Sequence, residues 1–117
     1  MLWHNLTDIS QLNDIQHLSK EQSSNGLTVL LFKHSTRCSI SSMALSRLES
    51  KWKDDDQIPT YFLDLLNHRD ISNEIEHLYG IEHASPQVLL IKNGVCVYHA
   101  SHSAISAADI FEAAKQQ

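Results

Sequence analysis

The sequence predicts an α/β domain: a mixed sheet of four strands with helices on both faces. Two patterns alternate along the 117 residues, namely unbroken apolar runs and stretches whose apolar residues recur every three or four positions. Strand–helix–strand units require right-handed crossovers and parallel pairing, and an Asn93-Gly94 pair between two apolar runs adds an antiparallel hairpin. The expected order is helix, strand, helix, strand, helix, strand, strand, helix, in a single domain over 1–117.

The first three elements follow from apolar spacing and from capping residues. A helix is expected from about Thr7 to Gln22, capped by Thr7 or Asp8 and closed near Gly26. The run Leu27–Phe32 is expected to be a strand covered on both faces. A second helix should begin at Cys38 and end near 51–53. The residues that carry the two helical patterns are Leu6, Ile9, Leu12, Ile15 and Leu18, and then Ile40, Met43, Ala44, Leu45, Leu48 and Trp52.

The second half continues the alternation. The acidic run Asp54–Gln57 is expected to be a solvated loop, because three adjacent carboxylates cannot all aim at one cation. Ser106–Asp109 has the form of a capping box that starts a last helix. The remaining expected elements are a strand over Ile58–Leu66, a helix over Arg69–Tyr79 stopped by Gly80, and strands over Gln87–Lys92 and Val95–Ala100.

Composition excludes several classes of protein. A net charge of −5 argues against a nucleic-acid-binding surface, and two cysteines do not make a disulfide framework. No apolar run approaches the ~20 residues of a membrane span, and no signal segment precedes the first helix. The expected location is therefore the cytoplasm, a reducing compartment, without membrane association.

Cys38 stands where a short loop gives way to a helix. Backbone N–H groups at a helix N-terminus favour an anion, and a thiolate is an anion. Lys33 and Arg37 are expected to add positive charge nearby, and His34 could add more when protonated. Thr36 belongs to the same polar surroundings, which favour a reactive thiol over a cysteine packed as a small hydrophobic side chain.

A second feature is Ser85-Pro86, just before the strand over 87–92. Proline has no N–H and belongs to a turn or a strand end at such a place. A reactive Cys, two alternating units, Ser-Pro and an Asn-Gly hairpin together resemble the thioredoxin fold, whose members carry a cis-proline facing the active cysteine. The resemblance implies a cis bond at Ser85-Pro86 and substrate contacts from both residues and from His34.

The local motif resembles one family within that fold. The string Lys33–Ser41 (KHSTRCSIS) is similar to the YtxJ-type general-stress family, the monothiol bacilliredoxins, and weaker similarity extends over essentially the whole chain. Cys38-Ser39-Ile40-Ser41 resembles the Cys-x-x-Cys motif of glutaredoxins with Ser41 in place of the second Cys. Ser39 stands where many members have Pro, which leaves a free N–H beside the thiolate.

The resemblance implies a thiol–disulfide oxidoreductase that removes bacillithiol from S-bacillithiolated proteins. Cys38 would attack the mixed disulfide, the protein thiol would leave, and bacillithiol would stay on Cys38. Ser41 cannot release it, because exchange needs a sulfur nucleophile, so a second thiol is required. The expected partners are S-thiolated proteins and the small thiol as co-substrate, with no bound cofactor or metal and a monomer or weak dimer.

Two other functions stay open. Monothiol glutaredoxins hold an iron–sulfur cluster between two protomers, although this chain lacks their Cys-Gly-Phe-Ser string and a Gly-Gly pair after Pro86. A non-catalytic thioredoxin-like binding module would carry Cys38 as a thiol of ordinary reactivity.

The second cysteine and the other histidines are given structural or open roles. With a two-residue hairpin, Cys96 faces Ile91 and lies about 16 Å from Pro86, too far to pair with Cys38. His99 and His102 lack further ligands at a metal-binding spacing. His83, like His34, could tune the thiolate or contact a ligand.

Overall fold

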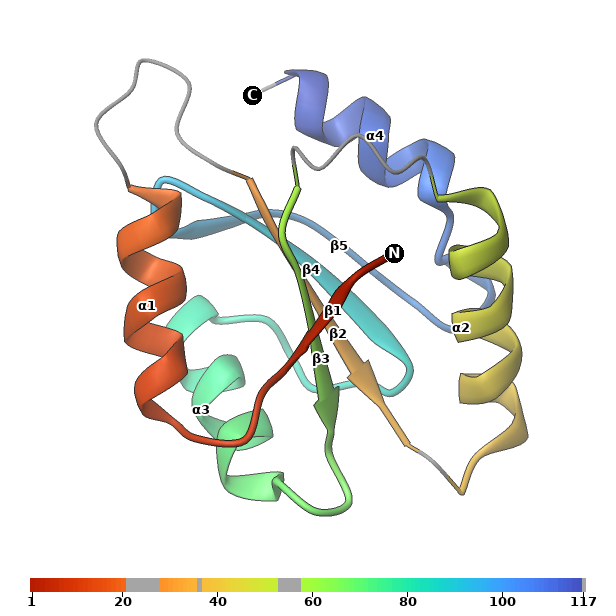
Figure 1. The fold of residues 1–117 in the computed structure, drawn as a ribbon, viewed down its shortest axis with the longest axis horizontal. Helices are drawn as coiled ribbons and strands as arrows, with labels where there is room; N and C mark the ends of the chain where they lie inside the picture. The colour runs from red at the N-terminus through yellow and green to blue at the C-terminus, as the bar shows by residue number, and fades with distance from the viewer. Residues whose placement is uncertain (21–27, 36, 53–57, 117) are drawn as a thin grey trace.

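The chain folds into a five-stranded sheet with helices on both faces (Figure 1). The computed structural model describes residues 1–20, 28–35, 37–52 and 58–116. In chain order the elements are β1 (Trp3–Asn5), α1 (Ser10–Ser19), β2 (Val29–His34), α2 (Ser39–Lys51), β3 (Thr60–Asp64), α3 (Arg69–Tyr79), β4 (Gln87–Lys92), β5 (Val95–Ser101), the short 3-10 helix η1 (His102–Ala104) and α4 (Ala107–Gln116).

The sheet has the order β1-β3-β2-β4-β5. β3 lies parallel between β1 and β2, whereas β4 lies antiparallel between β2 and β5, so the prediction of a mixed α/β sheet is confirmed. The prediction of four strands is wrong, because Trp3–Asn5 adds a fifth strand at the edge beside β3. This segment has no apolar alternation, and only its backbone pairing makes it a strand.

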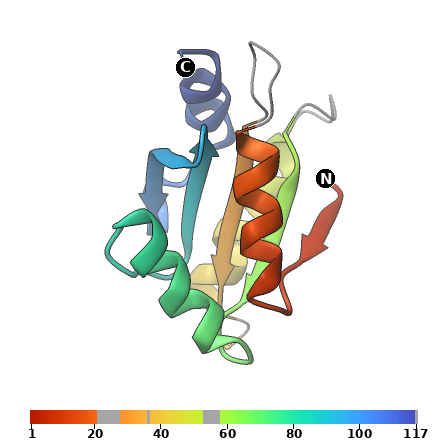
Figure 2. The ribbon, with the colours of Figure 1, turned by 90° about the vertical axis from the view of Figure 1, so that its left-hand side faces the viewer.

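Two apolar layers fill the space on either side of the sheet. α1 and α3 cover one face and α2 and α4 the other; Figure 2 shows α1 and α3 in front of the strands. Every residue of β2 is buried, and successive side chains enter opposite layers. Leu31 belongs to the layer of α1 and α3, whereas Leu30 and Phe32 belong to that of α2 and α4.

α1 is shorter than predicted. Its N-cap is Ile9, without a side-chain capping bond, and Ile9 is exposed rather than part of the apolar face. Asp8, one position before the N-cap, binds the first turn of the helix, because its carboxylate accepts the Ser10 N–H at 2.9 Å. This bond lowers the pKa of Asp8. The predicted closing residue, Gly26, lies outside the described residues.

The later elements follow the predictions closely. α3 and β4 have the predicted bounds, and Gly80 ends α3 with φ of 70°. Ser106 Oγ accepts the Asp109 N–H at 3.4 Å, which is the predicted cap of α4. β3 is shorter than the predicted 58–66, and the acidic run 54–57 lies outside the described residues.

The hairpin between β4 and β5 is anchored on α1. Asn93 and Gly94 have φ of 55° and 78°, as a type I′ turn requires, and Ile91 pairs with Cys96 as predicted. The Asn93 N–H donates to the Ser19 carbonyl at 2.9 Å, and the Gly94 N–H donates to Ser19 Oγ at 3.0 Å. A fully buried serine thus connects the end of α1 to the tip of the sheet.

Candidate active site

One end of the strands, called the sheet edge below, brings together the end of β2, the start of β4 and the end of β5. Lys33 pairs with Gln87, so the next residue along β2, His34, comes to the level of Pro86. The His102 N–H donates to the Pro86 carbonyl at 3.0 Å and adds the start of η1. The loop that leads to Cys38 leaves from the same edge, as the topology predicted.

Cys38 is the N-cap residue of α2 and is half-buried. Its backbone is extended, its N–H donates to the Ser35 carbonyl at 3.1 Å, and its carbonyl accepts the Ser42 N–H at 3.1 Å. The first N–H groups of an α-helix have no acceptor within the helix and carry its positive partial charge. The predicted placement of Cys38 at a helix start is confirmed, and its side chain makes no capping hydrogen bond to the helix.

The buried Ser41 side chain binds the loop that precedes Cys38. Its side chain is fully buried, and its Oγ accepts the Ser35 N–H at 3.1 Å and lies 2.7 Å from His34 Nδ1. A Ser41 hydroxyl that donates to Nδ1 satisfies both groups when the imidazole is neutral. The Ser41 hydroxyl therefore binds both the end of β2 and the loop that leads to Cys38.

His34 is held among aromatic rings on the α2 side of the sheet. Its ring centroid is 5.2 Å from that of Phe62 and 5.9 Å from that of Phe32. Burial lowers the pKa of His34, with Asp64 and Glu49 opposing this shift. A lowered pKa favours the neutral imidazole, so His34 is better suited to hydrogen bonding than to supplying positive charge.

Lys33 does not lie where the sequence placed it. Because side chains alternate along β2, its ammonium is on the α3 side of the sheet, whereas Cys38 begins α2 on the other side. Lys33 Nζ is 3.4 Å from the Ser72 carbonyl, and the residue is fully buried. Arg37 is exposed next to Cys38 and keeps its predicted position, whereas Thr36 lies outside the described residues.

The Ser85-Pro86 bond is cis, as predicted. Pro86 is buried at the start of β4, and Ser85 Oγ is buried without a hydrogen-bond partner. The neighbouring Gln87 uses its side-chain N–H to donate to the Glu82 carbonyl at 3.0 Å, while its Oε1 is buried and unpartnered. Polar atoms without partners therefore lie on both sides of Pro86.

The predicted role of His83, tuning the thiolate or contacting a ligand, does not include its contact with Lys33, and Ser72 and Glu76 have no predicted role. His83 Nδ1 lies 3.3 Å from Lys33 Nζ and 3.3 Å from Ser72 Oγ. Glu76 Oε2 accepts the backbone N–H of His83 at 3.0 Å. One signal could have found them: a lysine at an inward position of a buried strand needs polar partners, and these come from the next elements on that face.

Cys96 is remote from this edge. It pairs with Ile91 near the hairpin tip, whereas Gln87 and Ser101, beside Pro86, end the same ladder. Its thiol donates to the Tyr98 carbonyl at 3.3 Å, and burial raises its pKa, so it is a poor nucleophile.

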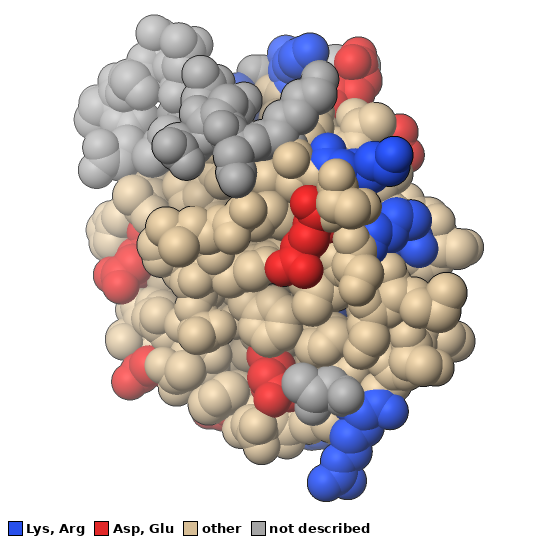
Figure 3. Space-filling model, turned by 45° about the vertical axis from the view of Figure 1, so that its right-hand side comes forward, with Lys and Arg blue, Asp and Glu red and all other residues tan. Residues whose placement is uncertain are grey.

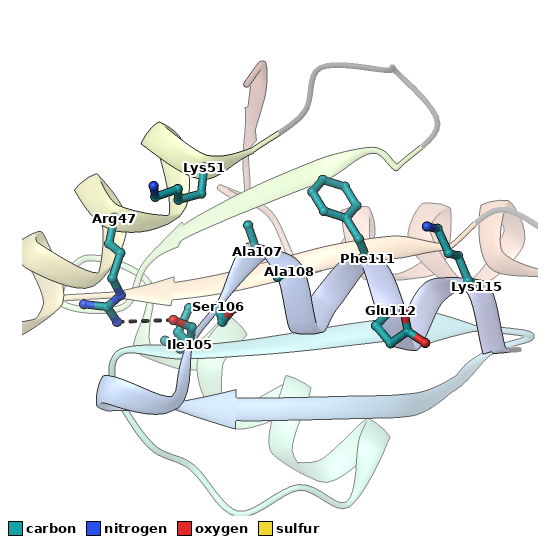
Figure 4. Close-up of a pocket in the computed structure, with 9 residues that line it drawn as sticks. All are labelled: Arg47, Lys51, Ile105, Ser106, Ala107, Ala108, Phe111, Glu112 and Lys115. Atoms are coloured by element: carbon teal, nitrogen blue, oxygen red, sulfur yellow. Dashed lines mark hydrogen bonds between the residues drawn. The ribbon is translucent and has the colours of Figure 1, made fainter.

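A groove on the face of the sheet covered by α2 and α4 contains none of these residues. It lies between α2 and α4, has a volume of about 530 Å³ and is bordered by Arg47, whose guanidinium donates to the Ile105 carbonyl at 3.3 Å (Figure 4). Lys and Arg side chains stand apart from one another on the face shown in Figure 3, mixed with acidic ones over a mostly uncharged surface. Within the described ranges, no His, Cys, Asp or Glu cluster could hold a metal ion, and no helix is long and apolar enough to span a bilayer.

Comparison with known proteins gives the family. Residues 4–110 match the family described as monothiol bacilliredoxin BrxC. The chain belongs to this family. Membership implies a function of thiol–disulfide oxidoreductase type.

Solved structures agree on the fold of this bacilliredoxin-family chain. One is a proposed oxidoreductase with a thioredoxin fold, 26% identical with a TM-score of 0.79, covering 95% of this chain and 92% of its own. Thioredoxin from Malassezia sympodialis is 19% identical with a TM-score of 0.70, covering 99% and 90%. Thioredoxin from Fasciola hepatica is 14% identical with a TM-score of 0.71, covering 96% of both chains. The thioredoxin-like fold predicted from the sequence is confirmed.

Proposed function

We propose that this chain removes a small thiol, bacillithiol, from S-thiolated proteins by a monothiol mechanism at Cys38. The observation that carries the proposal is the position of Cys38 as N-cap of α2, at the same sheet edge as Pro86. The substrates are mixed disulfides on cytoplasmic proteins, and bacillithiol is a co-substrate rather than a bound cofactor.

The first step is attack by the Cys38 thiolate on the bacillithiol sulfur of the mixed disulfide. A new sulfur–sulfur bond forms to Cys38, the old one breaks, and the protein thiolate leaves and takes up a proton. Helix N–H groups stabilise the attacking thiolate, and the exposed Arg37 adds a cation beside it.

The second step needs a thiol from outside the chain. Ser41 carries no sulfur and is engaged by His34 and the Ser35 N–H. Cys96 lies near the hairpin tip, about 16 Å along the ladder from Pro86. A second small thiol therefore attacks the bacillithiol sulfur, leaves as a disulfide with it, and restores Cys38.

Mass spectrometry tests the proposal directly. The protein is incubated with an S-bacillithiolated protein, and a matched S-glutathionylated protein serves as the control. We expect the mass of bacillithiol to appear on Cys38 while the client thiol is freed. A Cys38 that remains unmodified while the client stays thiolated contradicts the proposal. A visible iron–sulfur spectrum after anaerobic reconstitution, without exchange, would favour the cluster-carrier function instead.

Cys38→Ser and Cys96→Ser form a matched pair for the same assay. We expect Cys38→Ser to abolish exchange, because a hydroxyl cannot attack a disulfide under these conditions. Cys96→Ser should leave the exchange rate nearly unchanged, because that thiol lies at the far end of the β4–β5 ladder. Equal loss of activity in both variants would contradict the assignment of Cys38.

A further inference from the structure

A fully buried amine lies directly behind the segment that leads to Pro86. Lys33 has none of its surface exposed, and its Nζ donates to the Ser72 carbonyl at 3.4 Å. His83 Nδ1 lies 3.3 Å from the same nitrogen. Burying an ammonium costs a large free energy unless hydrogen bonds compensate it, so this amine depends on its partners. Burial lowers the pKa of Lys33, and the Glu76 charge opposes this shift.

The partners of Lys33 belong to the connection between α3 and β4. This connection has no helix or strand between Gly80 and Ser85, and side-chain bonds fix it instead. The Glu76 carboxylate accepts the backbone N–H of His83 at 3.0 Å, and the Gln87 side-chain amide donates to the Glu82 carbonyl at 3.0 Å. Lys33, on β2, contacts His83 in the middle of this connection and so attaches it at a third point.

The contact between Lys33 and His83 depends on one proton. A Lys33 ammonium has only donors, so Nδ1 must present its lone pair, and His83 must be neutral. A second proton on His83 would place two cations 3.3 Å apart. Of the charged groups facing His83, Lys33 and Arg69 oppose protonation and Glu76 favours it; burial and the Lys33 charge together lower the pKa of His83.

We propose that Lys33 and His83 are positioning residues for the exchange reaction. Their contact holds the 81–86 connection where Ser85 and Pro86 receive the mixed disulfide, and proton uptake by His83 releases it and weakens substrate capture. This inference rests on the proposed function, but it concerns a second group of residues on the opposite face of the sheet from α2.

Lys33→Met tests the attachment, with Lys51→Met as the control on an exposed lysine of α2. We expect the KM for an S-bacillithiolated protein to rise about tenfold in Lys33→Met, as for loss of a hydrogen bond to a charged group. The rate of Cys38 alkylation by iodoacetamide should not change. The urea midpoint should not fall, since an apolar side chain replaces a buried ammonium. An unchanged KM in folded Lys33→Met overturns the proposal.

Substitutions of His83 separate positioning from simple packing. His83→Leu removes the acceptor and should raise KM as Lys33→Met does. His83→Gln supplies a carbonyl that can accept from Lys33, so it should recover much of that loss and remove the rise in KM that the wild type shows at acidic pH. A His83→Gln variant that keeps the wild-type pH dependence overturns the proton step.

An NMR titration gives a readout independent of activity. The His83 ring signal is assigned by its absence in His83→Gln and followed against pH. Removing the neighbouring ammonium in Lys33→Met should move its midpoint upward, and a midpoint that does not move overturns the contact. If the wild type exchanges no mixed disulfide, the proposed function fails, and this titration alone decides whether Lys33 and His83 interact.

Discussion

Ser41 occupies the position of the second cysteine in a dithiol motif, yet its environment is that of a structural residue. It is fully buried, and its Oγ accepts the Ser35 N–H while contacting His34. The exposed Ile40 and Met43 flank it on α2, so the helix turns a polar residue inward and apolar ones outward. Apolar spacing could not predict this inversion, because it arises from the polar ends of β2 and its loop.

Ser41→Ala should destabilise the fold, whereas Ser46→Ala, at an exposed position of α2, should have little effect. The alanine leaves the Ser35 N–H and the His34 ring without a partner, which costs about 1–3 kcal/mol. Urea denaturation of both variants measures the difference. Equal midpoints would show that water replaces the Ser41 bonds at no cost.

Ser41→Cys should create a dithiol that releases its own mixed disulfide. Residues three apart in the first turn lie on one side of a helix, so sulfur at 41 can approach sulfur at 38. A Ser41→Cys protein that still accumulates with bacillithiol on Cys38, seen by mass spectrometry, would show that the buried site holds the new thiol away.

Among the elements, the strongest local signals gave the most accurate predictions. α3 and β4 have the predicted bounds, and the Asn-Gly turn sets the predicted register. Three things could not be predicted from the sequence: β1, which depends on backbone pairing with β3; the shorter α1; and the face to which Lys33 points. The strand β1 and the contacts of Lys33 are decided by partners remote in the chain, which local pattern does not contain. The start of α1 is decided by bonds of Asp8 and Gln11 to the backbone just before and at the first turn, which apolar spacing does not contain.

Gly94→Ala and Gly80→Ala should cost nearly the same stability. Both glycines have positive φ, 78° and 70°, where an alanine costs about 1–2 kcal/mol. A Cβ at Gly94 would meet the end of the Lys20 side chain, which can move aside, and a Cβ at Gly80 meets nothing within 4 Å. A much larger loss in Gly94→Ala, measured by thermal denaturation, would mean that Lys20 cannot move from the hairpin tip.

For the whole molecule, the buried His34 ring and the more exposed His83 ring make stability depend on pH. Burial lowers the pKa of His34 and of His83 below the ordinary 6.5. Below that value the unfolded chain takes up protons that the folded chain resists, so the free energy of unfolding is greatest above pH 6.5 and falls as the pH drops toward the folded pKa values.

Urea denaturation at about pH 7.5 and about pH 5.5 measures this loss. Substituting Gln at His34 or at His83 should reduce it, whereas His99→Gln, on the surface of β5, should leave it unchanged. A wild-type midpoint that is the same at both pH values would contradict the lowered pKa of the two rings.

The strand β1 also protects the molecule from its own copies. Without it, the outer backbone groups of β3 would be unpaired, and such an edge is a template for strand addition by another chain. Trp3 fastens the short strand, since its ring packs edge-on against Phe32 and Phe62 and its indole N–H donates to Glu49 at 2.9 Å. A chain shortened by residues 1–5 should therefore self-associate with rising concentration in sedimentation measurements, while the full chain keeps a constant mass.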